Sequence, residues 1–418
     1  MTYTLIRNTT LIDGNGGSPI PNAAILVKDN HIHNIGLADT ISLPNTEMIE
    51  VDAKGGFTLP GFIDTHVHFM LEGLDTVTML TTPFSLNFYQ AIDRMRRTVE
   101  AGITTVRDAG GTDLGMKQAV EQGLILGPRM QISISILTIT GGHLDYWMRS
   151  GQDLDLFPPP YPGHPGLGVR CDGVEEVRKK VREILRAGAE VIKVCSTGGV
   201  SSPTDHPDFT QFTIEELQVI VQETAYRRGI KVMAHAQGLE GIKNAVQAGV
   251  HSIEHGIYLD DKVIEMMLER GTFLVPTFSV VDGIIQHADE TGSPEWVIRK
   301  AKEVMDAHQK SIRKAYQAGV KIAMGTDSGV MPHGTNLCEL RLMCDIGMTP
   351  MESIVASTKV AAECLGWQDK IGTIETGKLA DIVVCNGDPI NNLRVLEDVN
   401  NIVLVMKDGQ VVKNLLYS

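Results

Sequence analysis

The stretch FIDTHVH at residues 62–68 joins a short apolar run to two histidines, and it begins a series of similar runs. The seven runs that follow are TTVRDAG at 104–110, MQISISILT at 130–138, VIKVCS at 191–196, KVMAHA at 231–236, HSIEHG at 251–256, FLVPTF at 273–278 and KIAMGTD at 321–327. Between them lie amphipathic segments of helical period, such as GVEEVRKKVREILRAGA at 173–189, and several end at glycine. Eight strands that alternate with helices predict an α/β fold, a (β/α)8 TIM barrel over residues 58–365.

The two ends of the chain have a different pattern, with short alternating runs and tight turns. The first end contains TLIRNTTLID and AAILVKDNHIHNIG, and the last contains LADIVVCN and NIVLVMKDGQVVKN, which an Asp-Gly pair divides into a hairpin. Each end is too short to bury a core of its own. We therefore expect residues 1–57 and 366–418 to pair into one small β-sandwich domain beside the barrel.

The composition is that of an ordinary globular protein. Of the 418 residues, 43% are hydrophobic and 21% are charged, which excludes a disordered or fibrous chain. Lys+Arg 37 against Asp+Glu 51 gives a formal charge of -14, which argues against nucleic acid or an anionic membrane as a partner. No basic and then apolar leader opens the sequence, and no apolar run approaches the ~20 residues of a membrane span. We expect a cytoplasmic protein whose six cysteines are reduced.

Histidine and aspartate side chains fall where the predicted barrel strands end. His66 and His68 are two residues apart in a strand, so both side chains lie on one face and point over the barrel mouth. His235 ends the fifth strand, His255 the sixth and Asp327 the eighth. A core histidine with a hydrogen-bond partner would explain any one of them, but packing does not explain five nitrogen and oxygen ligands at one rim. The set predicts a metal site.

Lys193 lies inside the apolar run of the fourth strand, where a charged ammonium is costly to bury. One interpretation is an ion pair inside the barrel. The other is that burial lowers the pKa of the amine from ~10.4, so that the neutral amine reacts with carbon dioxide. The resulting carbamate is an anionic oxygen ligand that can bridge two metal ions.

These motifs closely resemble the amidohydrolase superfamily with a binuclear metal centre and a carboxylated lysine. The resemblance covers nearly the whole chain and rests on HVH after GFID, the strand-four lysine, HAQG, IEHG, GTDSG and a late GKLADIVV. The branch it resembles most contains Xaa-Pro dipeptidases, arginine carboxypeptidases and ochratoxin amidases, with imidazolonepropionase more distant. The implied ligands of the first metal are His66, His68 and Asp327, those of the second are His235 and His255, and carboxylated Lys193 would bridge both. Zinc is the expected ion, although such donors also accept manganese, cobalt or iron.

The resemblance implies a metal-dependent hydrolase that cleaves the amide bond of dipeptides or N-acyl amino acids. Two nearby cations would convert a bridging water to hydroxide and polarise the carbonyl, while Asp327 would move the proton to the leaving amine. An alternative substrate is a cyclic or aryl amide, a carbamate or an imidazolone. A further alternative is an inactive scaffold relative, but such relatives lack metal ligands and all six positions are filled here.

Substrate contacts are expected from the loops that follow the strands. In the resembling peptidases a histidine at the place of His143 helps to bind substrate, so His143 is a candidate catalytic and substrate-binding residue, unless it only organises its loop. Tyr258 and Gln237 are further candidates, and Gln237 departs from the tyrosine expected in the prolyl and arginyl dipeptidases. Specificity should lie in the loops 140–172, 198–211 and 279–295. The candidate cations for a substrate carboxylate are His143, Arg149, Arg170, His206 and His333. The resemblance also implies a homo-oligomer.

Overall fold

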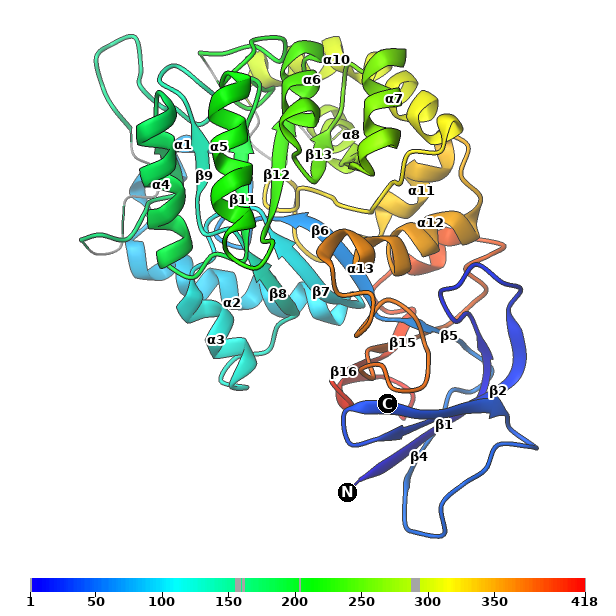
Figure 1. Cartoon of the computed structure of the whole chain (residues 1–418). Helices are drawn as coiled ribbons and strands as arrows, with labels where there is room; N and C mark the ends of the chain where they lie inside the picture. The colour runs from blue at the N-terminus through cyan, green and yellow to red at the C-terminus, as the bar shows by residue number, and fades with distance from the viewer. Residues whose placement is uncertain (1, 155–158, 160–161, 203, 287–293, 418) are drawn as a thin grey trace.

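The computed structural model describes residues 2–154, 159, 162–202, 204–286 and 294–417. Parts of the three predicted specificity loops therefore lie outside the described residues. The chain forms a body in which helices surround parallel strands, and a separate sheet at which both termini lie (Figure 1).

The strands of the body form two parallel sheets. The first sheet contains β6 (Phe62–Val67), β7 (Ile103–Asp108) and β8 (Arg129–Ile132). The second has the order β10-β9-β11-β12-β13-β14, with β9 (Ile136–Thr138), β10 (Gly168–Arg170), β11 (Val191–Cys195), β12 (Lys231–Ala236), β13 (Ser252–His255) and β14 (Phe273–Val275). All registers between these neighbours are parallel, and helices connect most of them, as a βαβ arrangement requires.

Helices cover the outside of the strands (Figure 1). They are α1 (Thr76–Thr81), α2 (Phe84–Glu100), α3 (Leu114–Glu121), α4 (Val174–Arg186), α5 (Ile214–Ala225), α6 (Leu239–Ala248), α7 (Asp261–Arg270), α8 (Phe278–Gln286), α10 (Glu295–Ala318), α11 (Cys338–Asp345), α12 (Pro350–Ala356) and α13 (Lys359–Leu365). In α4 the buried residues Val177, Val181 and Ile184 follow the helical period and form one apolar face toward the strands. None of the helices in the described ranges is long and apolar enough to cross a membrane.

Two predicted strands differ in the structure. The third run, 130–138, is broken into β8 and β9, and between them Ile134 has the left-handed φ of 67° that no continuous strand adopts. The eighth run, 321–327, forms no strand and has one isolated bridge, between Ile322 and Leu274, with a second at the following Ser328. Its backbone still joins the two sheets, because Ala323 N donates to Leu274 O at 3.0 Å and Thr65 N donates to Met324 O at 3.0 Å.

The two ends of the chain share one sheet, in the order β17-β16-β15-β5-β1-β2-β3 with β4 beside β1. Its strands are β1 (Tyr3–Leu11), β2 (Ile20–Lys28), β3 (His31–Leu37), β4 (Ile49–Asp52), β5 (Phe57–Pro60), β15 (Ile382–Cys385), β16 (Ile402–Lys407) and β17 (Gln410–Asn414), with the 3-10 helix η1 (Leu393–Leu396) before β16. The antiparallel pair β5 and β15 joins the halves, and one apolar cluster contains Ile6 and Ile25 from the first end with Ile382 and Leu404 from the last. The two ends therefore bury a shared core.

The Asp-Gly turn predicted from the sequence is confirmed, and a glycine also forms the junction between the terminal sheet and the body. The Asp-Gly pair between β16 and β17 has φ of 49° at Asp408 and 74° at Gly409, and positive values at both positions are those of a type I′ hairpin. Gly61 separates β5 of the terminal sheet from β6 of the body, and a Cβ there would lie 2.1 Å from Thr104 Oγ1. Glycine at this position lets the terminal sheet lead directly into the first strand of the site.

We predict that the contact between the body and the terminal sheet depends on Arg129. Its guanidinium on β8 forms ion pairs with Asp381 and Asp408 of the terminal sheet, and the side chains of Arg129 and Asp381 are only 17% and 4% exposed. Arg129→Ala leaves a buried carboxylate without its cation and should lower the free energy of unfolding by about 3 kcal/mol in urea titrations. Arg7→Ala breaks the exposed pair with Glu50 and should cost less than about 1 kcal/mol. Equal losses in the two variants would contradict this interpretation.

Candidate metal centre

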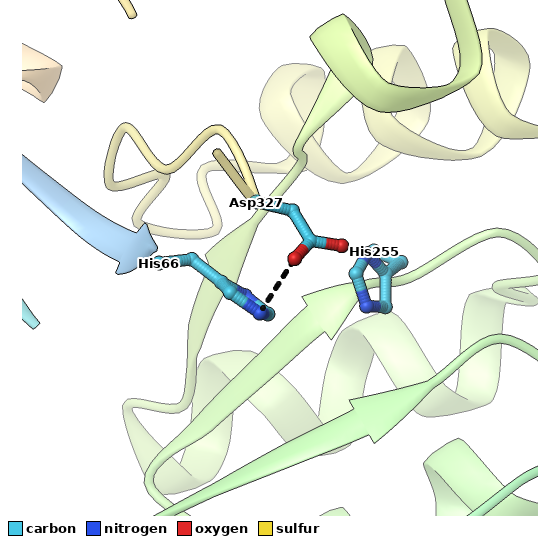
Figure 2. A group of neighbouring side chains, drawn as sticks. All are labelled: His66, His255 and Asp327. Carbon is cyan, nitrogen blue, oxygen red and sulfur yellow. Dashed lines mark ion pairs between the residues drawn. The ribbon is translucent and has the colours of Figure 1, made fainter. Parts of the chain in front are cut away.

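Side chains from three parts of the body converge at the C-terminal ends of the strands. Figure 2 shows His66, His255 and Asp327 pointing toward one another, and one ligand atom of each lies within 4.8 Å of the others. His68 joins them through its Nε2, which lies 3.2 Å from Asp327 Oδ1. The rings of His235 and His255 have centroids 4.6 Å apart. The histidines and the aspartate predicted from the sequence therefore surround one point.

The backbone is strained where two of these side chains leave their strands. His255 has a φ of 71° and Asp327 a φ of 59°, in the left-handed region that non-glycine residues seldom occupy. Such a conformation costs about 1 kcal/mol or more and persists where surrounding contacts impose it. At Asp327 the amide N donates to His66 O at 2.7 Å, which connects this segment to β6 and holds the carboxylate beside His66.

Each histidine is held by one ring nitrogen, which leaves the other free to face the cluster. The Nδ1 atoms of His68 and His255 pair with Gly110 O at 3.0 Å and Thr277 Oγ1 at 2.7 Å. His235 is held by its other nitrogen, Nε2, which donates to Gly198 O at 3.1 Å. An outer hydrogen bond of this kind fixes the tautomer and orientation of metal-binding histidines. This donor set fits a divalent metal ion.

Lys193 extends from β11 into the same cluster. Its Nζ lies 3.2 Å from His66 Nε2, and the residue is 2% exposed. Burial lowers the pKa of Lys193, and the raising effect of Glu254 and Asp327 does not compensate. Among the described residues, none forms an ion pair with its ammonium, so an internal ion pair does not account for this lysine. The lowered pKa favours the neutral amine over the ammonium, and the neutral amine is the form that reacts with carbon dioxide.

Asp327 remains a carboxylate in this environment. Burial by itself raises its pKa, but His66, His68 and Lys193 outweigh that effect and the pKa lies below its usual range. Its Oδ1 is 3.5 Å from His66 Nε2. The carboxylate can therefore serve as an anionic ligand and as a proton acceptor.

The sequence did not predict the buried pair that supports His66, which is Glu254 and Arg107. Glu254 is completely buried and its carboxylate accepts from His66 Nδ1 at 2.9 Å and from the guanidinium of Arg107 at 2.9 Å. Arg107 also donates to Thr65 O at 2.7 Å. The signals in the sequence were the charged residues inside the apolar runs TTVRDAG and HSIEHG, but strand alternation alone does not reveal that they pair across the barrel.

A second carboxylate, Asp64, supports the backbone on both sides of the site. Its Oδ1 accepts from the amides of His66 at 3.0 Å and Thr326 at 3.1 Å. Burial raises the pKa of Asp64 to about 6. Asp64 therefore links the end of β6 to the irregular segment that carries Asp327.

Two cavities meet at the cluster. Both are lined by His143, Ser201, His235, His255, Asp327 and Val330. The first cavity continues over Leu71, Leu144, Tyr146 and Leu167, and the second over Val200, Ile257, Val281 and Ile284. Residues from each of the three predicted specificity loops are among these lining residues. Mainly aliphatic walls therefore extend on two sides of a polar centre.

The predicted substrate contacts are only partly at these cavities. His143 lines both, and Gln237 lines the second with its buried Oε1 unpaired. Tyr258 lines neither and packs in an apolar cluster beside them. Of the other candidate cations, Arg170 pairs with Asp145 and Asp153, His206 with Asp208 and Glu303, His333 is buried against His68 O, and Arg149 is exposed. Among the five, only His143 reaches a cavity.

Comparisons with known proteins identify the family. The model of the amidohydrolase family matches residues 57–412. The chain belongs to the amidohydrolase family. Ochratoxinase from Aspergillus niger is 34% identical over 421 residues, which are 98% of this chain and 86% of the relative. A crystal structure of an amidohydrolase has a TM-score of 0.91 at 37% identity and covers 99% of this chain and 100% of its own. A crystal structure of a Xaa-Pro dipeptidase with methionine bound in its active site has a TM-score of 0.89 at 35% identity, covering 99% and 100%.

These relatives confirm the resemblance expected from the sequence. This chain is a hydrolase of carbon-nitrogen bonds, and its family acts on small amides or peptides. Its body has a TIM-barrel-like α/β fold. A metal centre is general in this family, and the cluster at the strand ends is a possible site for it.

We predict that Glu254→Gln weakens metal binding. The neutral amide cannot match the charge of Arg107 or polarise the His66 ring as the carboxylate does, and loss of such an outer partner costs about 10- to 100-fold in metal affinity. Competition against a chelator measures the affinity. Glu269→Gln, on the exposed side of α7, is the matched control and should bind metal as the unaltered protein does. Unchanged affinity in Glu254→Gln would show that Glu254 serves the fold alone.

Proposed function

We propose that the protein is a metal-dependent amidohydrolase that cleaves the amide bond of dipeptides or N-acyl amino acids. The observation that carries the proposal is the burial of Lys193 within 3.2 Å of His66, inside a cluster of histidines and an aspartate. In this proposal His66, His68 and Asp327 would hold one metal ion and His235 and His255 a second, and carboxylated Lys193 would be a ligand of both. Zinc is the expected ion, because nitrogen and oxygen donors of this kind suit it.

The names of the relatives support an amide or peptide substrate. A Xaa-Pro dipeptidase is similar over 99% of this chain, and its structure contains methionine in the active site. Imidazolonepropionase of Shewanella pealeana matches 94% of this chain at 23% identity. The first relative favours a dipeptide and the second a cyclic amide, and the greater identity favours the dipeptide.

The residues of the chain divide the work of hydrolysis. Two divalent ions, when bound, supply the charge that lowers the pKa of a water and polarises the amide carbonyl. The carboxylate of Asp327 would accept the proton of the attacking water and deliver it to the departing amine nitrogen. His143 lines both cavities and would donate from its ring to the substrate carbonyl. The aliphatic walls hold the two halves of the substrate and exclude water.

An aryl or cyclic amide is the second candidate substrate. Lys193 is the only lysine or arginine among the described residues that line the two cavities. A free carboxylate on the substrate would then depend on His143 for a positive partner. Walls of this composition favour uncharged groups on both sides of the scissile bond.

The finer organisation of the fold belongs to the same proposal. We infer that the body is a (β/α)8 barrel over residues 58–365, and that residues 1–57 and 366–418 form the β-sandwich. The shared apolar cluster of the two ends and the bonds through residues 321–327 support this division. A homo-oligomer is proposed from the family resemblance alone.

The substrate class is tested by release of amino acids from a library of dipeptides and N-acyl amino acids. The protein is supplied with zinc and bicarbonate, because bicarbonate provides the carbon dioxide for Lys193. We expect release concentrated on particular C-terminal residues. Protein that binds two metal ions and releases nothing from the library would contradict the peptidase proposal and favour aryl or cyclic amides.

We predict that Asp327→Asn separates metal binding from turnover. The amide can still offer an oxygen to the metal but cannot accept a proton, so the variant should retain much of its metal and lose activity by about 10²- to 10⁴-fold. Metal content and kcat are measured on the same preparation. Turnover near that of the unaltered protein in a metal-replete variant would overturn the proposed role of Asp327.

A further inference from the structure

Lys300 on α10 is a buried lysine that the proposed chemistry does not use. Its ammonium donates to three backbone carbonyls of the loop after β11, those of Gly199 at 3.2 Å, Ser202 at 2.8 Å and Asp205 at 2.6 Å. The side chain is 8% exposed. An ammonium has three donors and no acceptor, so these carbonyls satisfy it completely. The described part of the loop is curled around this one charge.

The same loop also carries Asp205, whose negative charge compensates that of Lys300. The carboxylate of Asp205 is completely buried, and its Oδ1 lies 3.7 Å from Lys300 Nζ. Its Oδ2 accepts from His143 Nδ1 at 3.0 Å and from Gly199 N at 3.2 Å. A buried carboxylate without a cation is strongly unfavourable, so the placement of Asp205 against His143 depends on Lys300.

The ring of His143 is held by β12 and by the loop after β11. It stacks on His235 of β12, with centroids 4.3 Å apart and an angle of 14° between the planes. Gly199 of the loop also lies against the ring, and a Cβ there would be 2.4 Å from the ring carbon Cε1. The remaining ring nitrogen, Nε2, is 3.4 Å from Ser201 Oγ, a residue of both cavities. A shift of the loop would therefore move the ring.

The face of α10 that carries Lys300 also supports the end of β13. His308 Nε2 donates to His255 O at 2.9 Å, and Ser311 Oγ donates to Gly256 O at 3.0 Å. Residues 300, 308 and 311 lie on one side of the helix, because spacings of eight and eleven residues correspond to about 2.2 and about 3.1 turns and keep the three within about 80° of one another. One helix face thus contacts backbone on both sides of the second cavity.

We propose that Lys300 is a positioning residue for His143, acting by holding Gly199, Ser202 and Asp205 in the arrangement that places Asp205 against His143 Nδ1. The proposal rests on the role proposed above for His143 in binding substrate. The contacts of Lys300 with three carbonyls and a carboxylate, all 95 or more residues away in sequence, thereby fix the orientation of one imidazole ring.

The test compares Lys300→Met with Lys302→Met, which alters an exposed lysine on the same helix. A crystal structure of Lys300→Met should show Asp205 and His143 separated and the stack on His235 lost. Its kcat/KM should fall about 10- to 100-fold, since a displacement of about 1 Å in an active site can cost 10²-fold. Lys302→Met should retain both the geometry and the activity. An unchanged contact between Asp205 and His143 in Lys300→Met would overturn the proposal.

A double-mutant cycle separates positioning from general destabilisation. If Lys300 acts through His143, adding Lys300→Met to His143→Ala should change kcat/KM by less than about twofold. An equal fall in both backgrounds would overturn the proposal. If Lys300→Met does not fold, Lys300→Arg replaces it in both measurements, because it keeps the charge but not the direction of the three donors. If the unaltered protein cleaves no amide, the proposed function fails, and the crystal structures still decide the role of Lys300.

Discussion

The carboxylate of Glu254, shared between the Arg107 guanidinium and the His66 ring, is the constraint on which the site depends. Both charges are fully buried inside the ring of strands, where neither is stable without the other. Their pairing connects β7 to β13 across the interior and fixes the outer nitrogen of His66 on β6. The stability of the barrel and the orientation of a candidate ligand therefore rest on the same pair of charges.

Residues 321–327, the least regular of the eight segments, lead directly to Asp327. A regular eighth strand would direct alternate side chains in and out, whereas residues 321–327 use a few selected bonds to both neighbouring strands. Asp64 accepts from the backbone on each side of this junction, and Asp327 leaves it with a positive φ. Strain at His255 and Asp327 is tolerated because the surrounding bonds impose it, and it directs both side chains to one centre.

Long-range contacts also connect the site to the helical layer. The loop after β11 takes its conformation from Lys300, and the end of β13 is bonded to His308, although both residues belong to α10. The cavities therefore have mainly aliphatic walls beside a polar layer around the candidate metal ligands. This division suits a hydrolase that must hold the apolar parts of a substrate while charge develops at one bond.

The sequence by itself determined the alternation of strands and helices, the pairing of the two ends and the six residues that converge at the strand ends. These follow from periodicity, which reports which side of an element faces inward, and from residue types that have few reasons to lie inside a barrel. The break at Ile134 and the irregular eighth segment could not be predicted, because periodicity reports neither a left-handed φ at one residue nor backbone bonds to distant strands. Only the tertiary structure decided that Glu254 pairs with Arg107, that Tyr258 lines neither cavity while His143 lines both, and that Lys300 holds a distant loop. Each depends on distances between segments far apart in the chain, and a sequence pattern contains no information about which charges meet across an interior.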